Sequence, residues 1–161
     1  YAINIPRGGR FYVEKAMEND VPKMYWSKLQ KGETIQGEDG RVFTPDMVIG
    51  GERKGIKVTY CTDTRPTKSI VENAKNSDLF ICEGMYGEDD MVEKAKINKH
   101  MTFEEAATLA KEAEVSCLWL THYSPSLIRP EEYVDKAKRI FPNTVAAKDR
   151  RTIELEFDKT E

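Results

Sequence analysis

Hydrophobic residues along this chain recur at two spacings, one typical of helices and one of buried strands. In residues 103–113, FEEAATLAKEA, the phenylalanine and the alanines fall at helical spacing, and Thr102 with Glu105 forms a capping box at the start. The small side chains predict a helix that packs closely against a flat surface. Residues 117–120, CLWL, form a nearly continuous apolar run, which predicts a strand covered on both faces.

Strand-like and helical segments alternate through most of the remaining chain. Runs of β-branched and aromatic residues predict strands, whereas wider apolar spacing bounded by capping residues, Pro or Gly predicts helices. Further strands are predicted at 1–5, 56–61, 78–82, 143–147 and 152–157, and further helices at 11–17, 22–29, 70–74, 91–97 and 130–140. This alternation predicts an α/β fold in which helices flank a sheet.

The first 54 residues differ from the rest of the chain. They hold only short elements, including a hairpin in which Ile35 and Val42-Phe43 flank the turn GEDG. Several lysines and arginines lie on the connections between these elements. Longer apolar runs begin at Gly55. We therefore predict an arm-like or connecting segment over residues 1–54 and the main domain over residues 55–161.

Composition and charge limit the possible classes of function. The 161 residues are 33% charged and 39% hydrophobic, as in one globular domain, and without a membrane-spanning run we expect a cytoplasmic protein with no membrane partner. The net charge of −3 argues against a general nucleic-acid binder, although residues 1–60 carry 10 Lys or Arg against 8 Asp or Glu. Three cysteines, Cys61, Cys82 and Cys117, lie in or beside apolar runs, which favours reduced, buried thiols.

Polar residues that can carry chemistry follow three of the predicted strands. Asp63, Glu83 and His122 each stand where a strand ends. Neighbouring strands place such residues at one edge of the sheet, and open α/β sheets bind their ligands there. The second histidine, His100, lies just outside the capped helix start. The sequence therefore predicts that these side chains share one crevice.

Metal binding is one interpretation of this group. A carboxylate and an imidazole are normal metal ligands, but catalytic zinc needs at least three protein ligands, and the chain has two histidines and no CxxC. From spacing alone, Asp63 equally fits a turn or helix-capping carboxylate. His100 by itself fits a surface or capping position, and the cysteines fit core thiols. These alternatives stay open at this level.

Three segments carry a resemblance to a known family. They read TDTRPTKSIVENAKNSDLFICEGMY from residue 62, KHMTFEEAA from residue 99 and LWLTHYSPS from residue 118. In order and spacing they resemble the second half of the ribonuclease Z family, tRNA 3′ processing endonucleases of the metallo-β-lactamase superfamily. That family typically shows GDTRP, HEATF, a His-Ser-Thr segment and THFS. The resemblance covers about residues 55–157, and the 22 positions from His100 to His122 suit the family's pair.

The resemblance implies a fold, an activity and several residue roles. The chain would be the C-terminal half of a four-layer αββα metallo-β-lactamase sandwich, with a mixed sheet and flanking helices. The activity is zinc-dependent removal of the 3′ trailer from precursor tRNA by phosphodiester hydrolysis. Asp63 matches the carboxylate that bridges two zinc ions, and His122 matches the last histidine ligand. His100 matches a histidine that assists cleavage without binding metal, and we group Glu83 with it as catalytic.

Substrate contacts are also implied by position. Thr64, Arg65 and Ser124 stand in the matching motifs and are expected to contact the RNA. Lys23 and Lys28 belong to the segment that occupies the place of the family's tRNA-gripping arm.

The chain also departs from the family's pattern. Thr62 stands where Gly is usual, Cys82 where His is usual, and Ser126-Leu127 where an Arg-Tyr pair often follows. The HxHxDH motif, which supplies the other ligands, has no match in these 161 residues. We therefore expect the chain alone to be inactive and to bind zinc weakly. A further N-terminal half or a partner in a homodimer should cover the apolar face of its sheet.

Two alternatives to this function stay open. The first is a metal-dependent hydrolase of the same fold that acts on another phosphodiester or an ester. The second is a non-catalytic binding module.

Overall fold

The computed structural model of the protein describes residues 1–158. Over these residues the chain forms two compact units, which we describe separately. The larger unit comprises residues 1–5 and 56–156, and the smaller one comprises residues 6–55 with residues 157–158. Residues 1–5, which the sequence assigned to the arm, thus group with the larger unit. Within the described part of the chain, every helix is too short or too polar to span a membrane.

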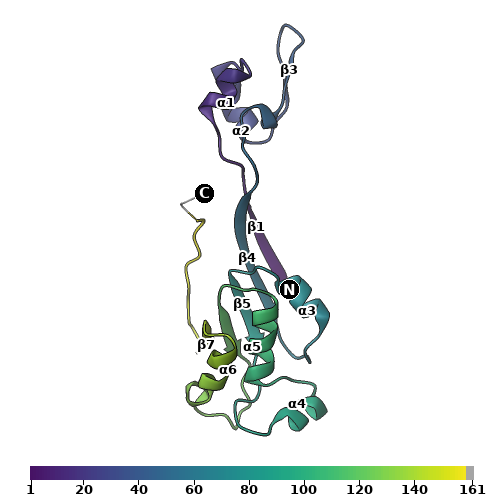
Figure 1. Ribbon diagram of the computed structural model, residues 1–161, viewed down its shortest axis with the longest axis vertical. Helices are drawn as coiled ribbons and strands as arrows, with labels where there is room; N and C mark the ends of the chain where they lie inside the picture. Colours follow the sequence, from purple (N-terminus) through teal and green to yellow (C-terminus); the bar gives the residue numbers. More distant parts are fainter. Residues whose placement is uncertain (159–161) are drawn as a thin grey trace. The chain divides into compact units, whose positions relative to one another are not determined.

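A five-stranded sheet with the order β1-β4-β5-β6-β7 forms the centre of the larger unit (Figure 1). Strands β4, β5, β6 and β7 are parallel to one another. Tyr1 and Tyr60 exchange both backbone hydrogen bonds, the pattern of an antiparallel pair, so the sheet is mixed, as predicted. The elements are β1 (Ala2–Arg7), β4 (Arg53–Cys61), α3 (Lys68–Ala74), β5 (Leu79–Glu83), α4 (Val92–Asn98), α5 (Phe103–Glu112), β6 (Leu118–Thr121), η3 (Pro130–Glu132), α6 (Val134–Ile140) and β7 (Thr144–Ala146).

Helices α3, α5 and α6 pack on one face of this sheet. Ala106, Ala107 and Ala110 of α5 are fully buried, and their small side chains let the helix lie close to β5 and β6. Figure 1 shows α5 lying over β5. The capping box at the start of α5 is confirmed. The Thr102 hydroxyl accepts a hydrogen bond from the backbone N–H of Glu105, and the Glu105 carboxylate accepts one from the N–H of Thr102. This cap fixes where α5 begins.

The opposite face of the sheet carries a smaller apolar cluster. Leu79, Trp119 and Ala147 are buried in it, so the predicted strand covered on both faces is confirmed for residues 118–120, while Cys117 lies just before the strand. The strand predicted over residues 152–157 is wrong, since this stretch forms no ladder. Leu155 nevertheless packs against the cluster. Alternation in a sequence places side chains on a face but does not supply a backbone partner for hydrogen bonds.

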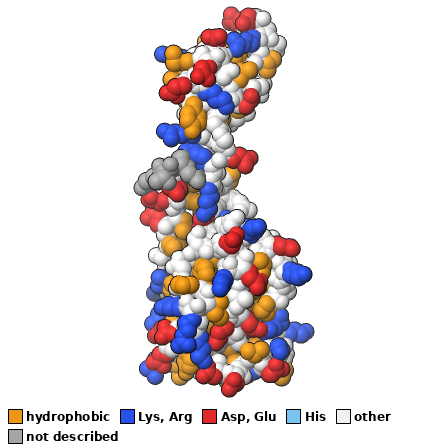
Figure 2. Space-filling model, in the orientation of Figure 1, with side chains coloured by type: hydrophobic (Ala, Val, Ile, Leu, Met, Phe, Trp, Pro, Cys, Tyr) orange, Lys and Arg blue, Asp and Glu red, His pale blue; other side chains and the backbone are white. Residues whose placement is uncertain are grey.

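The smaller unit consists of short elements around an apolar cluster of its own, made of Ala16, Val21, Leu29, Phe43 and Val48. The predicted hairpin is confirmed, because β2 and β3 pair antiparallel with Ile35 opposite Phe43. Figure 2 shows the Lys and Arg side chains of the smaller unit interspersed with Asp and Glu over the viewed face. The elements are α1 (Val13–Glu18), η1 (Lys23–Tyr25), α2 (Trp26–Gln30), β2 (Ile35–Gln36), β3 (Val42–Phe43) and η2 (Pro45–Met47).

Candidate functional site at the carboxyl edge of the sheet

Asp63 and His122 meet at the carboxyl edge of the sheet. Asp63 follows β4 and His122 follows β6, two strands that both pair with β5. The Nε2 atom of His122 lies 3.1 Å from Oδ1 of Asp63. Both side chains are exposed, so a ligand can reach this pair from solvent.

The backbone at both residues is unusual. Asp63 has a φ of 50° and His122 a φ of 56°, which places both in the left-handed region. Few residues other than glycine adopt this conformation, and holding it costs free energy. Such positions concentrate at functional sites, where surrounding contacts hold the backbone. The two strands therefore end in turns that direct Asp63 and His122 toward each other.

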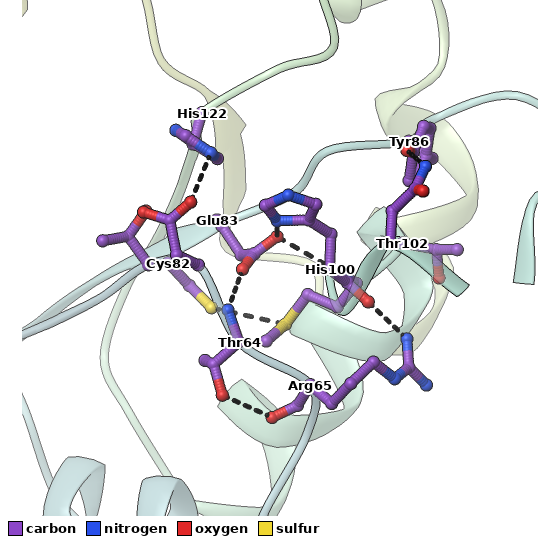
Figure 3. Close-up of polar contacts among 12 residues, drawn as sticks. Thr64, Arg65, Cys82, Glu83, Tyr86, His100, Thr102 and His122 are labelled. Carbon is purple, nitrogen blue, oxygen red and sulfur yellow. Dashed lines mark hydrogen bonds and ion pairs between the residues drawn. The ribbon is translucent and has the colours of Figure 1, made fainter. Parts of the chain in front are cut away.

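His100 lies in the short link between α4 and α5. Helix α4 ends at Asn98 and is followed by its C-cap Lys99, whose φ of 61° is left-handed, and α5 begins after its cap Thr102. The ring of His100 is centred 5.4 Å from that of His122. Its Nδ1 atom lies 3.0 Å from Oε2 of Glu83 (Figure 3). With Nδ1 on this carboxylate, Nε2 is the nitrogen that remains for chemistry.

Glu83 is the buried centre of the site. It is fully inaccessible to solvent, yet its carboxylate accepts three hydrogen bonds. Oε1 accepts from the N–H of Thr64 at 2.5 Å, and Oε2 accepts from the N–H of Met101 at 3.2 Å in addition to its contact with His100. A buried carboxylate is stable only with such partners. Glu83 thereby joins the loop after β4 to the link before α5.

Arg65, for which the resemblance implied a contact with RNA, donates hydrogen bonds to the protein itself. Its Nη1 atom donates to the backbone carbonyl of His100 at 2.5 Å and to Oε2 of Glu105 at 2.8 Å, while Nη2 donates to Oε1 of Glu105. These hydrogen bonds to Glu105 raise the pKa of the Arg65 guanidinium. Thr64, also predicted to contact RNA, donates its hydroxyl to the carbonyl of Arg65. The pairing of Arg65 with Glu105 was not predicted from the sequence, because the capping box already accounted for a glutamate at this position.

The other predicted substrate residues lie outside this cluster of contacts. The backbone N–H of Ser124 donates to the carbonyl of Met85, and its hydroxyl lies 2.8 Å from that of Ser126. Ser124 thus ties the loop after β6 to the loop after β5. Lys23 and Lys28 are exposed residues of the smaller unit.

The three cysteines are free thiols, as expected. Cys82, which stands where the resembling family has histidine, is fully buried and its Sγ lies 3.7 Å from Sδ of Met101. Cys61 is its register partner on β4. The hydrogen bond between these two thiols lowers the pKa of Cys61 and, together with burial, raises the pKa of Cys82. Cys61 and Cys117 are only partly buried, so the expected burial holds fully for Cys82 alone among the three.

The donor atoms at this edge fit a divalent metal ion. Asp63, His100 and His122 each offer one carboxylate oxygen or imidazole nitrogen, and these atoms lie within 4.8 Å of one another. Ligand atoms bound at about 2.0–2.2 Å to a tetrahedral ion are roughly 3.4 Å apart, close to the separation of Asp63 and His122. Oxygen and imidazole donors suit zinc and similar ions. The residues present can therefore hold part of a metal centre.

The fold and this edge define an α/β domain with a candidate metal site at the carboxyl ends of its strands. Two of the possible donors, Asp63 and His122, contact each other, and the third, His100, contacts Glu83. The chain belongs to the beta-lactamase superfamily, whose domain model matches residues 35–123.

Curated relatives narrow the comparison within that superfamily. The protein named Ribonuclease Z from Lachnoclostridium phytofermentans is 63% identical over 161 residues, which is 100% of this chain and 53% of the relative. Ribonuclease Z from Lachnospira eligens is 63% identical over 158 residues, 98% of this chain and 52% of the relative. The resemblance inferred from the three motif segments is thus confirmed. The chain spans about half the length of the curated relatives it matches.

A solved structure supports the fold. Human tRNase Z, short form, aligns with a TM-score of 0.51 and 24% identity over 72% of this chain and 36% of the human chain. At this level of identity the match concerns the arrangement of strands and helices. It agrees with the predicted half of a metallo-β-lactamase sandwich.

Proposed function

We propose that this chain is part of a zinc-dependent endoribonuclease that removes the 3′ trailer from precursor tRNA. The observation that carries the proposal is the contact between Asp63 and His122 beside the hydrogen-bonded pair of His100 and Glu83. These residues lie in a chain that is 50–63% identical to proteins named Ribonuclease Z.

Each of the four residues has a chemical task in this proposal. Asp63 and His122 would hold zinc together with ligands from outside this chain. When bound, zinc supplies Lewis-acid stabilisation of the negative charge that develops on a phosphate oxygen. His100 gives a proton from Nε2 to the leaving oxygen. Glu83 accepts the Nδ1–H of His100, which sets the tautomer and stabilises the charged ring.

A chimera provides the complete protein for testing. In it, residues 1–161 replace the matching 53% of the Lachnoclostridium phytofermentans relative. We expect the chimera to cut precursor tRNA at the trailer. Its kcat/KM for this reaction should be far higher than its kcat/KM for hydrolysis of bis(p-nitrophenyl) phosphate. Preference for the small diester would favour a hydrolase of another substrate. Binding of tRNA without cleavage of either substrate would favour the non-catalytic binding module.

The chain alone is expected to bind zinc weakly. Catalytic zinc needs three or more protein ligands, and Asp63 with His122 supplies two. Titration calorimetry of residues 1–161 with zinc should therefore give a Kd weaker than about 1 μM, against the far tighter values of complete protein sites. Tight stoichiometric binding that disappears in His100→Ala as well as in His122→Ala would contradict this expectation, because His100 would then be a ligand.

We also propose that further protein covers the second face of the sheet in the complete enzyme. Tyr60 of β4 is 41% exposed, and Val58, Ile81 and Val145 are only partly buried around the apolar cluster on that face. An apolar sheet face of this kind normally packs against another layer. The remaining half of the relatives' length, or a second copy of the chain in a homodimer, can supply it.

The smaller unit is proposed to grip the tRNA. Lys23 and Lys28 are both exposed on it. In the chimera, Lys23→Glu with Lys28→Glu should weaken tRNA binding about tenfold at low salt and lower the slope of log K against log salt by roughly 1–2, because contacts with phosphates release counterions. Fluorescence anisotropy over a salt series measures both quantities.

A charge-matched control separates arm contacts from net charge. Lys111→Glu with Lys138→Glu makes the same change of charge at exposed positions of α5 and α6. Equal losses in both double variants, or none in the arm variant, would contradict the assignment of Lys23 and Lys28.

A further inference from the structure

We propose that Arg65 and Glu105 form a clamp that positions His100, and that Arg65 serves this purpose instead of contacting the RNA. The inference deepens the proposed function and rests on it for the task of His100. It concerns Arg65, for which the resemblance implied a substrate contact, and Glu105, which the sequence pattern assigned only to a helix cap.

Three successive residues after β4 reach three different parts of the site. Asp63 contacts His122 at 3.1 Å. The N–H of Thr64 donates to Glu83, and the guanidinium of Arg65 donates to the carbonyl of His100, each at 2.5 Å (Figure 3). A single loop therefore sets the position of the metal-binding carboxylate and of the link that carries His100.

The peptide unit between His100 and Met101 is held at both ends. Its carbonyl oxygen accepts from Arg65, and its N–H donates to Glu83. The same Glu83 oxygen takes Nδ1 of the His100 ring. Backbone and ring are thus fixed by two side chains from different strand-end segments. Loss of the Arg65 contact would free the carbonyl and let the ring move relative to Glu83.

Glu105 completes the clamp from the start of α5. Its Oε2 accepts from the N–H of Thr102 and from Arg65, and its Oε1 accepts from the second guanidinium nitrogen. The paired planar geometry of guanidinium and carboxylate cannot be reproduced by lysine, which is a single point charge. The cap of α5 and the position of His100 therefore depend on one ion pair.

The surroundings of the ion pair disfavour a phosphate ligand. Arg65 and Glu105 border a hollow of about 720 Å³ whose lining includes one further cation, Lys136, which pairs with Asp89. The lining also includes the carboxylates of Glu88, Asp89, Asp90, Glu104 and Glu112. Acidic side chains at this density repel the phosphates of RNA. Within the described chain, the guanidinium of Arg65 already donates three hydrogen bonds to protein oxygens.

Kinetics of the chimera test the clamp. Arg65→Lys and Glu105→Gln should each lower kcat for precursor tRNA by about 10- to 100-fold, since displacement of a catalytic group by about 1 Å has effects of this size. The double variant should be no worse than either single one, because the two residues act as a unit. The Kd for tRNA and its salt slope should stay at the parent values. A weaker Kd with a slope lowered by about 1 and an unchanged kcat would assign Arg65 to a phosphate and overturn the clamp.

A spectroscopic readout separates this inference from the proposed function. In the metal-free chimera, the Nδ1–H proton of His100, assigned by its loss in His100→Ala, should be visible by NMR and should broaden or vanish in Arg65→Lys. Arg129→Lys is the matched control, because Arg129 pairs with Glu132 on the surface. If Arg65→Lys leaves the His100 signal unchanged, the clamp fails whether or not the chimera cuts tRNA. If the signal is lost in a chimera that cuts no RNA, the clamp stands and the proposed function fails.

Discussion

His122→Ala in the chimera is expected to remove the bound metal ion and catalysis together. The imidazole lies 3.1 Å from Asp63 at the strand edge and is one of the donors that fit the ion. Changing a group that only orients a metal ligand typically lowers metal affinity or activity by about 10- to 100-fold. Loss of the ligand itself should therefore lower turnover by more than about 100-fold. Asp63→Ala should behave in the same way. Metal content by mass spectrometry and cleavage rates of the same preparations check both results.

The left-handed backbone at these two residues provides a control for misfolding. Alanine is strained at a φ of 50° or 56°, whereas glycine is not. Asp63→Gly and His122→Gly should therefore be more stable than the alanine variants by roughly 1–2 kcal/mol in urea denaturation of the metal-free protein. They should still lose metal and activity. A glycine variant that regains either one would show that backbone strain, and not the missing ligand, caused the defect in the alanine variant.

The sequence predicted those features that depend on neighbouring residues or on strand direction. Thr102 and Glu105 are three positions apart, so their capping box could be recognised directly, and the structure contains it. Asp63 and His122 are far apart in the chain, but both follow parallel strands of one sheet. Because parallel strands end at the same edge, their approach could be expected before any coordinates.

Contacts between side chains from distant segments could not be predicted in the same way. Arg65 and Glu105 are 40 positions apart. No local sequence pattern indicates that they pair, and the capping box with Thr102 already gave Glu105 a role. Asp and His adopt left-handed conformations more often than most other non-glycine residues, but the residue type alone does not show that Asp63 and His122 do so. These features arise from tertiary contacts that hold the backbone in a costly conformation.

The strand wrongly predicted over residues 152–157 has the same kind of cause. Ile153, Leu155 and Phe157 alternate with polar residues, which is the pattern of a half-buried strand. In the structure Leu155 reaches the apolar cluster of the sheet, but the described backbone around it forms no ladder. Of the three apolar side chains only Leu155 is partly buried, while Ile153 and Phe157 are exposed, so the alternation predicted neither the burial of the whole stretch nor a hydrogen-bonding neighbour.

His100→Ala is expected to separate catalysis from metal binding. If His100 gives a proton to the leaving oxygen, its loss should lower turnover by about 100-fold or more while the metal content of the chimera stays at the parent level. The substitution should cost at most roughly 1 kcal/mol of stability, because the Thr102 cap of α5 and the other two hydrogen bonds of Glu83 remain.

Two further measurements interpret the His100→Ala result. Glu83→Gln keeps the size of the side chain but removes the charge that stabilises a protonated His100, so it should also lower turnover without metal loss. His122→Ala serves as the contrasting case, in which metal and activity disappear together. Normal turnover in His100→Ala would remove the residue from the mechanism. Loss of metal would make it the third ligand of the cluster with Asp63 and His122, because its donor atom lies within reach of theirs.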